Sequence, residues 1–355
     1  MPAARRATGP GRVNLIGDHT DYNHGVALPM AIDLGITVSF VPGPEGRFRV
    51  SSPTAGSVDP VTLSSGIEAR ADAVAAIEPP WARLVGAMIA LSPAGTGGEL
   101  HISSTLPMGA GLSSSAALCV ALAEVLALPE TGAGTAREVA LRCQQAEHLA
   151  GVPVGAMDPL VCAGGVAGHA LCIDFPSLEV RPVALPPDAE VVVVDSGQRR
   201  TVGASAYAVR VAECAAAAEV VGPLGLARAR DLVRLGDPVL RRRARHVVTE
   251  CARVHRAVTA LESGDLAGAG ALMSESHRSL AGDFEVSTPE VDALVAGLVA
   301  RPGVLGARMT GAGFGGSVVV LCRAGALDPG RLGRPVWRVQ ASDGTVARRS
   351  RPQPS

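Results

Sequence analysis

The densest group of reactive side chains lies near the N-terminus, in residues 11–23. It combines an arginine, carboxylates, a histidine, hydroxyls and amides, in a chain of which only 18% of the residues are charged. Gly11 and Gly17 allow the backbone to turn tightly. Carboxylate, imidazole and amide groups held in fixed directions suit a ligand with many hydroxyl groups, such as a sugar. The alternative is an N-capped turn between strands, with Asp18 and Asp21 as the caps.

A glycine- and serine-rich segment at residues 107–117 suits an anion. Gly109 and Gly111 let backbone N–H groups point outward, and serines 113–115 follow at the first turn of an expected helix. Free N–H groups and the helix dipole favour a phosphate there, and hydroxyls can ligate a magnesium ion that bridges phosphates. Helix capping by serine is the alternative. Because two glycines and three hydroxyls exceed what a cap needs, we expect a phosphate loop.

Two acidic residues farther along the chain could complete a phosphoryl-transfer site. Glu147, late in an expected helix, is a candidate magnesium ligand, because Mg²⁺ in such sites takes few carboxylates besides phosphate oxygens. Asp158 lies among the apolar residues Met157, Pro159 and Leu160, where a carboxylate needs a partner, which makes it a candidate base. A surface charge at Glu147 and a cap at Asp158 are the structural alternatives.

A second glycine-rich loop occupies residues 309–317, just before an apolar strand. Its glycines permit close approach of the backbone to a ligand or to another loop. The sequence does not decide between these two interpretations.

The composition excludes several classes of protein. At 355 residues, 47% of them hydrophobic, the chain is long enough for two domains. A net charge of −1 gives no electrostatic case for nucleic acid, and no apolar run could span a bilayer, so we expect a cytoplasmic protein. Seven cysteines without a C-x-x-C pair indicate a reducing compartment and no structural zinc. All 32 basic residues are arginine, which excludes Schiff-base and P-loop lysines.

A framework of strands and helices must bring these segments together. Apolar periodicity predicts helices at about 81–91, 113–126, 136–150, 204–220, 238–262, 265–281 and 289–300. Strands are expected within 26–41 and near 99–105, 191–194, 306–310, 316–322 and 335–341. Prolines predict a linker at residues 176–190, and the tail from Val346 is expected to fray. The order of elements is that of an α+β protein.

Together these segments resemble the galactokinase family, of the superfamily that includes homoserine, mevalonate and phosphomevalonate kinases. Residues 11–22 match the family's first signature, Gly-Arg-Val-Asn-Leu-Ile-Gly-Glu-His-Thr-Asp-Tyr, with Asp18 in place of Glu. The phosphate loop, the late glycine loop and the segments 144–148 and 151–158 match as well, so the resemblance extends from about residue 9 to 343. The first signature separates galactokinases from their relatives, whereas the two loops identify only the superfamily.

The resemblance implies a two-domain α+β kinase architecture, with residues 1–180 and 188–345 as the domains and the active site in the cleft between them. The implied reaction transfers the γ-phosphoryl group of ATP to the C1 hydroxyl of α-D-galactose, with Mg²⁺ as the cofactor. We expect galactose and ATP as the partners, no nucleic acid or membrane, and a monomer.

Roles follow by matching position. Asp158 would be the catalytic carboxylate, and Arg12 its partner beside the transferring phosphoryl group. The sugar site would be lined by Asp18, His19, Thr20, Asp21, Gly155 and Tyr207. ATP would be held by Gly109, Ala110, Gly111, Leu112, Ser113, Ser114 and Ser115, and Mg²⁺ by Ser115 and Glu147.

The chain departs from the family pattern in three places. Asp18 is one methylene shorter than Glu, so its sugar contact must be remade by a shift or a water. Pro159 stands where the family usually has Gln, which removes an amide and a backbone donor. The given sequence also begins almost at the first signature, so we expect it to lack the family's leading helix and most of its first strand. A kinase for N-acetylgalactosamine or arabinose, and a non-catalytic galactose and ATP sensor, are the alternative functions.

Overall fold

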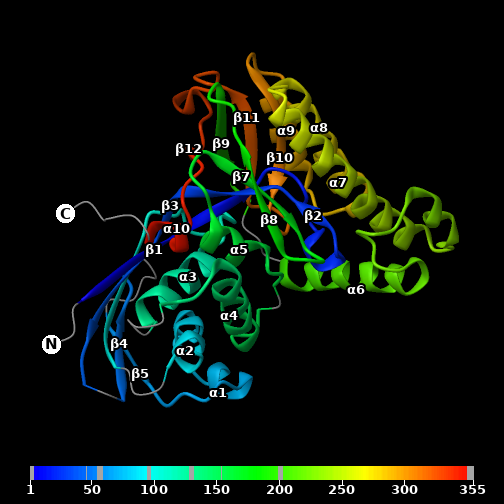
Figure 1. The fold of residues 1–355 in the computed structure, drawn as a ribbon. Coiled ribbons are helices and arrows are strands. Elements are labelled where there is room, and N and C mark those ends of the chain that lie inside the picture. The colour runs from blue at the N-terminus through cyan, green and yellow to red at the C-terminus, as the bar shows by residue number, and fades with distance from the viewer. Residues whose placement is uncertain are drawn as a thin grey trace.

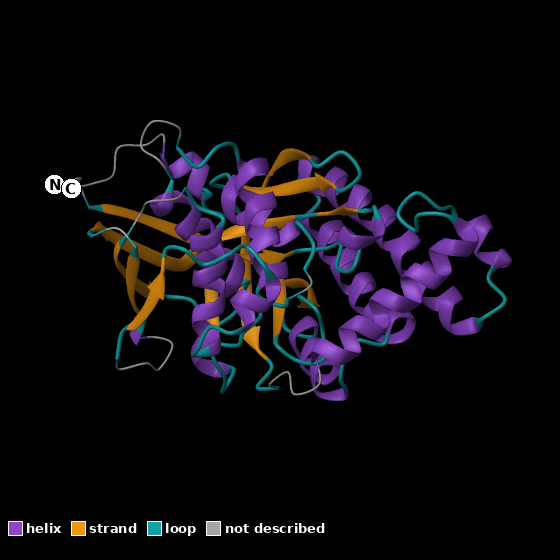
Figure 2. Cartoon of the chain, turned by 90° about the horizontal axis from the view of Figure 1, so that it is seen from below, coloured by secondary structure: helices purple, strands orange, loops and turns teal. Residues whose placement is uncertain are grey.

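The computed structural model describes residues 4–44, 46–53, 59–93, 97–127, 132–152, 154–198 and 203–349. In these residues three sheets are covered by helices (Figure 1). Seen from below, one group of helices extends as an arm away from the sheets (Figure 2). No helix in the described ranges is long and apolar enough to cross a membrane.

The first sheet has the order β1-β3-β6-β4-β5. Its strands are β1 (Arg5–Asn14), β3 (Pro29–Pro42), β6 (Gly98–Ser104), β4 (Arg47–Ser51) and β5 (Val61–Ser64). Neighbours are antiparallel except β4 and β6, which are parallel. Buried and exposed residues alternate along β6, because side chains of a strand point alternately to the two faces. One face of this sheet therefore packs against helices and the other faces solvent.

The helices of the first half are α1 (Ala71–Ala75), α2 (Arg83–Ala90), α3 (Ser114–Leu126), α4 (Ala136–Leu149) and α5 (Met157–Gly164), with the short 3-10 turns η1 (Asp21–Asn23) and η3 (Pro80–Ala82). α3 packs on β1 and β3. Gly9 makes this approach possible, since a Cβ at that position would lie 2.0 Å from the carbonyl oxygen of Ala117. The close packing sets the N-terminus of α3 beside the end of β1, where Arg12 lies.

The second half contains a four-stranded antiparallel sheet of order β10-β11-β9-β12. Its strands are β9 (Ala189–Asp195), β10 (Val304–Thr310), β11 (Ser317–Arg323) and β12 (Val336–Val339). The helical elements are α6 (Gly203–Val221), η4 (Ala229–Arg234), α7 (Pro238–Glu262), α8 (Leu266–Ser279), the π-helical turn η5 (Leu280–Phe284), α9 (Pro289–Val299), η6 (Pro329–Arg331) and α10 (Thr345–Arg349). A third sheet joins β2 (Val26–Ala27), β7 (His169–Asp174) and β8 (Glu179–Ala184).

The structure confirms the α+β fold class and the predicted helices, whose bounds differ by a few residues. The linker predicted at 176–190 is wrong, because β8 lies within it. Pro182 is tolerated there since β8 is an edge strand, which has fewer ladder hydrogen bonds to supply. The expected fraying from Val346 is also wrong as far as residue 349: α10 packs against α5, and Arg349 pairs with Glu124 at 2.6 Å. The division at 180 and 188 stays a prediction.

Candidate functional site

Arg12, near the end of β1, and Asp158, in the first turn of α5, form a two-point ion pair. Arg12 Nε lies 2.6 Å from Asp158 Oδ1, and Nη2 lies 2.7 Å from Oδ2. Such parallel charged hydrogen bonds fix both position and orientation. Arg12 is 5% exposed, whereas the side chain of Asp158 is 25% exposed. One side of this carboxylate is therefore accessible to a substrate hydroxyl.

The phosphate loop supplies the remaining contacts of this pair. Arg12 Nη1 donates to the carbonyl of Gly111 at 2.8 Å, and the Ser113 hydroxyl donates to Asp158 Oδ2. Ser113 has a left-handed φ of 60°, and its side chain makes no capping bond to α3. The capping alternative is thus wrong for Ser113. Three segments that are distant in sequence meet at one carboxylate.

The N-terminus of α3 opens beside this carboxylate. Gly109 and Gly111 have positive φ angles of 75° and 74°, which glycine adopts without strain. Ser114 is exposed and Ser115 half-buried. Because the side chain of the N-cap residue is engaged elsewhere, the first N–H groups of the 13-residue helix remain available to an anion.

Glu147, on α4, is 1% exposed, so its interpretation as a surface charge is wrong. Burial, together with the nearby charge of Asp158, raises the pKa of Glu147 to about 7, and a hydrogen bond from Ser115 partly opposes this. Its Oε2 has no hydrogen-bond partner among the described residues. A buried oxygen of this kind fits a divalent cation. No three His, Cys, Asp or Glu side chains gather into a metal site in the described ranges.

Pro159 removes no hydrogen bond from within helix α5. It is the third residue of α5, where a backbone N–H has no partner within the helix. Asp158 lies in the same first turn, at the positive end of the helix dipole, which favours a carboxylate. The missing backbone donor therefore leaves the geometry of Asp158 intact.

Asp21, the first residue of η1, lies next to Gly155. A Cβ at Gly155 would come within 1.9 Å of Asp21 Oδ2, so any larger residue there would displace the Asp21 carboxylate. Burial, and then the charge of Asp158, raises the pKa of the half-buried Asp21 to about 7. The carboxylates of Asp21 and Asp158 thus lie close enough to repel each other, and separate ligand hydroxyls, one donating to each carboxylate, would relieve this repulsion.

His19 lies in a group of aromatic rings. Its ring centroid is 4.5 Å from that of Phe284 and 5.9 Å from that of Tyr207, and its Nδ1 is 2.9 Å from the Tyr22 hydroxyl. Burial, and then the charge of His246, holds the pKa of His19 well below its ordinary value. The imidazole is therefore neutral, and its buried Nε2 has no partner among the described residues. This leaves one directed polar atom for a ligand.

Two other expected sugar contacts are engaged within the protein. The Thr20 hydroxyl lies 2.8 Å from the carbonyl of Gly17 and 2.9 Å from that of Val26, so it holds the loop together. Asp18 accepts from Asn14 Nδ2 at 3.0 Å and from Arg308.

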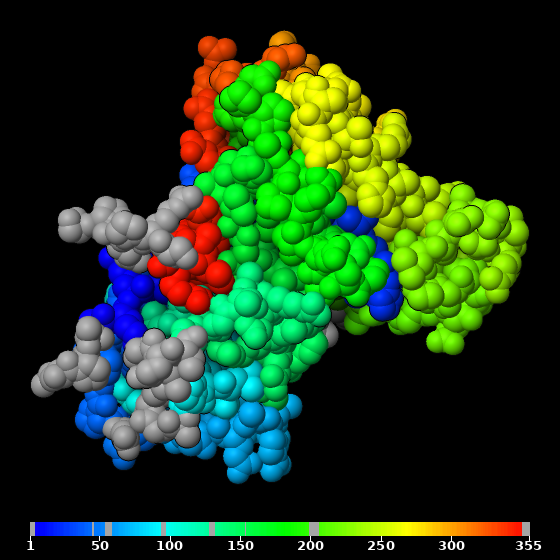
Figure 3. Space-filling view, viewed as in Figure 1, coloured from blue at the N-terminus to red at the C-terminus, as the bar shows by residue number. Residues whose placement is uncertain are grey.

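The signature loop also contacts the second half of the chain: Gly225 N donates to the carbonyl of Asn23 at 2.8 Å. Figure 3 shows blue N-terminal atoms between the green segment and the yellow-green helical arm.

The late glycine loop packs against the phosphate loop. The Ser317 hydroxyl donates to the carbonyl of Ala110 at 2.8 Å, and Phe314 N donates to the carbonyl of Val286 at 2.8 Å. From the other side, the backbone N–H of Arg12 in β1 donates to the carbonyl of Leu112 at 3.1 Å. The side chains of Ala110 and Leu112 are buried, so these two residues offer a ligand only backbone atoms.

Sequence reasoning missed Asn14, Glu250 and Arg308, which surround Asp18. Arg308 carried a usable signal, since a charged residue stands there among the apolar residues of an expected strand. Asn14 lies inside the signature itself. Glu250 lies in a helix with many charges, so nothing local distinguishes it.

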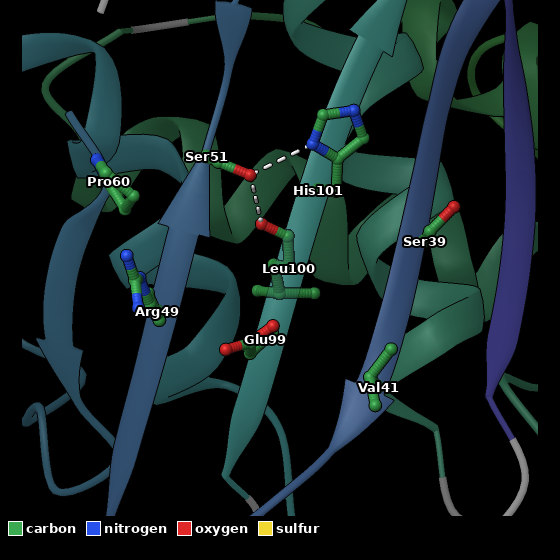
Figure 4. Close-up of a pocket in the computed structure, with 8 residues that line it drawn as sticks. All are labelled: Ser39, Val41, Arg49, Ser51, Pro60, Glu99, Leu100 and His101. Atoms are coloured by element: carbon green, nitrogen blue, oxygen red, sulfur yellow. Dashed lines mark hydrogen bonds between the residues drawn. The ribbon is translucent and has the colours of Figure 1, made fainter. Parts of the chain in front are cut away.

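A separate hollow of about 400 Å³ lies on the solvent face of the first sheet (Figure 4). Its lining comes from β3, β4 and β6 and from Pro60, and Ser51 lies 3.0 Å from the ring nitrogen of His101. The charged side chains at its rim, Arg49 and Glu99, are exposed. Buried, directed polar groups of the kind found around Asp158 are absent from the residues that line this hollow, and they mark the Asp158 region as the functional site.

Arg12, Asp158 and the phosphate loop lie in segments that match known families. The galactokinase galactose-binding signature matches residues 2–42, the N-terminal domain of GHMP kinases matches residues 82–165, and their C-terminal domain matches residues 257–329. Human galactokinase is 42% identical over 89% of this chain and 83% of its own length. The chain belongs to the galactokinase family.

A galactokinase of Streptomyces coelicolor is also 42% identical, over 90% of this chain and 84% of its own. The structure superimposes on Lactococcus lactis galactokinase complexed with galactose with a TM-score of 0.86, at 28% identity, covering 97% of this chain and 95% of that one. A mevalonate kinase matches with a TM-score of 0.66 at 18% identity, which shows the shared fold. As a galactokinase-family member, the chain is an ATP-dependent sugar kinase.

Proposed function

We propose that this enzyme transfers the γ-phosphoryl group of ATP to the anomeric hydroxyl of α-D-galactose, giving galactose 1-phosphate and ADP. The observation that carries the proposal is the Arg12–Asp158 pair, a half-open carboxylate held between the signature loop and the N-terminus of α3. A sugar hydroxyl at Asp158 and a phosphate at α3 would be adjacent. The choice of galactose as the sugar is supported by the similarity to galactokinases.

In this proposal Asp158 accepts a hydrogen bond from the C1 hydroxyl and takes its proton as the phosphoryl group is transferred. Phosphoryl transfer depends mostly on positioning and electrostatics. Arg12 supplies both: its two bonds orient the carboxylate, and its positive charge lies beside the developing charge of the phosphoryl group. The backbone N–H groups of α3 hold the phosphates, which explains how a chain without lysine binds ATP.

We assign the magnesium site to Ser115 and Glu147. When bound there, the ion would neutralise negative charge on the phosphates. The unpartnered Oε2 of Glu147 and its raised pKa support the assignment, because a cation would favour the ionised carboxylate that burial disfavours.

The sugar contacts in this proposal are Asp21, the free Nε2 of His19, and Tyr207. Galactose and glucose differ only in the direction of the C4 hydroxyl. A buried carboxylate that pairs with an axial hydroxyl loses its partner when the epimer binds, at a cost of ~1–3 kcal/mol or more. Asp21 would therefore contribute to selecting galactose. Gly155 contributes by leaving Asp21 its space.

We further propose a monomer that works in the cytoplasm and binds neither nucleic acid nor membrane. The seven cysteines are all free, and six of them are buried, as expected for a protein of a reducing compartment. The net charge of −1 offers no attraction for polyanions.

The product identifies the reaction. Incubation with ATP, Mg²⁺ and galactose should yield ADP and a single sugar phosphate, whose ³¹P signal is coupled to the anomeric proton. ADP release across a panel of galactose, N-acetylgalactosamine, arabinose and glucose then ranks the substrates. A phosphate on another hydroxyl, or faster turnover of N-acetylgalactosamine or arabinose, would contradict the proposal.

A further inference from the structure

Asp18 lies in a buried network that crosses the two halves of the chain. One carboxylate oxygen, Oδ1, accepts from Asn14 of β1, and the other, Oδ2, accepts from Arg308 of β10. Both Arg308 and Asn14 are 0% exposed. The backbone carbonyl of Asp18 accepts from His246 of α7, which lies 3.1 Å away. Both ends of the residue are thereby fixed.

Glu250, on α7, lies behind Arg308. Its Oε1 is 3.8 Å from Arg308 Nη2, and it accepts from the backbone N–H of Gly17 at 2.9 Å and from the Ser276 hydroxyl at 2.5 Å. Its other oxygen accepts from Arg253 at 2.8 Å. Burial alone would raise the pKa of Glu250, but Arg308 and the other partners outweigh it and lower the pKa to about 2. Glu250 is therefore ionised and holds both Arg308 and the signature loop.

Asp18 lies close enough to the proposed sugar site to affect sugar binding. It directly precedes His19, whose buried Nε2 has no partner among the described residues and is proposed to meet the sugar. Yet it has little freedom of its own, because burial and two direct donors leave its carboxylate a single position. The residue that decides this position is Arg308, since among the described residues its guanidinium is the one charged group in direct contact with that carboxylate.

We propose that Arg308, supported by Glu250, is a positioning residue of the sugar site: it sets where the Asp18 carboxylate stands and, through it, sugar affinity. This inference rests on the proposed sugar kinase function. A single contact joins Arg308 to Asp18, and Arg308 Nε and Nη1 have no partner among the described residues, nor has Asn14 Oδ1. Asp18 thus leaves two donor nitrogens of Arg308, Nε and Nη1, unused. A side chain one methylene longer would meet the same donors at a different place and change the pocket.

A double-mutant cycle tests the proposal. The four proteins are the unmutated enzyme, Asp18→Asn, Arg308→Lys and the double variant, assayed with whichever sugar the unmutated enzyme phosphorylates fastest. We expect each single substitution to raise the KM for sugar at least tenfold, with kcat within threefold and the KM for ATP within twofold. Because the two residues act as a unit, the double variant should resemble the worse single variant.

Arg323→Lys serves as the matched control, since Arg323 on the neighbouring strand β11 forms only an exposed pair with Asp188. Its kinetic constants should not change. If Arg308→Lys does not yield folded protein, Glu250→Gln replaces it in the cycle under the same criteria. The proposal would be overturned if the effects of the two single substitutions on the KM for sugar multiply in the double variant. An unchanged KM for sugar, or an equal rise in the KM for ATP, would overturn it as well. Absence of sugar phosphorylation by the unmutated enzyme contradicts the proposed function instead, and equilibrium binding of galactose by the same four proteins then decides the inference.

Discussion

Two arginine–aspartate pairs in this molecule have the same chemistry but different surroundings. Arg12 contacts Asp158 through two bonds, and the carboxylate remains 25% exposed at the side chain. Arg308 contacts Asp18 through a single nitrogen, and both side chains are buried, at 0% and 3% exposed. A carboxylate with an accessible side can take part in a reaction. The enclosed Asp18 carboxylate, both of whose oxygens already accept from protein donors, is suited to holding a position.

The comparison explains why the two pairs have different neighbours. Asp158 is met by the phosphate loop, through Ser113, and by Arg12, so nucleotide and sugar would converge on it. Asp18 is met by β10, so its position depends on the second half of the chain. Substitutions at the first pair should therefore change the rate of the chemical step, and those at the second should change affinity.

The largest effect is expected for Asp158→Asn. The amide keeps the shape but cannot take the proton, and general-base catalysis typically contributes ~10²–10⁴ in rate. We expect kcat to fall by about that factor, while ATP still binds, as calorimetry can measure. Asp188→Asn, on the surface, is the control and should behave as the unmutated enzyme. Activity within tenfold of the unmutated enzyme would remove Asp158 from the mechanism.

Arg12→Lys should lower kcat at least tenfold with a smaller change in the KM for sugar. An ammonium cannot make the two parallel bonds that the guanidinium makes to Asp158. Comparison with Arg308→Lys gives the sharpest contrast, because the substitution is the same in both. Arg12→Lys should lower kcat, whereas Arg308→Lys should raise the KM for sugar. An unchanged kcat in Arg12→Lys would show that the role of Arg12 is structural.

Ser115→Ala and Glu147→Gln should each raise the Mg²⁺ concentration needed for half-maximal rate several-fold. Each removes an oxygen ligand or its charge. Titration of the initial rate with Mg²⁺ at saturating ATP and sugar measures this. Glu99→Gln, exposed on β6, is the control. If neither substitution shifts the Mg²⁺ dependence, the metal assignment is wrong.

The smallest effect is a pH dependence of stability. Asp21 and Glu147 have folded-state pKa values of about 7, above the ordinary value of ~4 for such groups. A raised folded pKa means that their contribution to stability is complete below pH ~4 and is lost as the pH rises to about 7. The fall in Tm of the ligand-free enzyme over this range should be smaller in Asp21→Asn and Glu147→Gln. Equal slopes in all three proteins would show that the two groups are not perturbed.

Local sequence patterns predicted most elements of the fold, because helical periodicity and the β-branched run at 191–194 are properties of short segments. β8 was missed because Pro182 suggests a linker, whereas an edge strand accepts proline. Its position at the edge depends on pairing with β7, which no local pattern contains.

At the site, the motifs predicted Arg12, Asp158 and the phosphate loop, and the structure brings them together. The placement of Asp18 could not be predicted, since its partner Arg308 lies 290 residues away. Ser113 was expected at the phosphate, but its hydroxyl bonds Asp158, which depends on the close packing of α3 against β1. Contacts between distant segments were the part that sequence alone did not supply.

The most direct test of the account is the ratio of kcat/KM for galactose to that for glucose, measured with the unmutated enzyme by ADP release. Sites that hydrogen-bond a particular hydroxyl discriminate by up to ~10⁴–10⁵ against a ligand that lacks it. We predict a strong preference for galactose, and its loss in Asp21→Ala with ATP affinity retained. Equal turnover of the two sugars by the unmutated enzyme would contradict both the role of Asp21 and the proposed reaction.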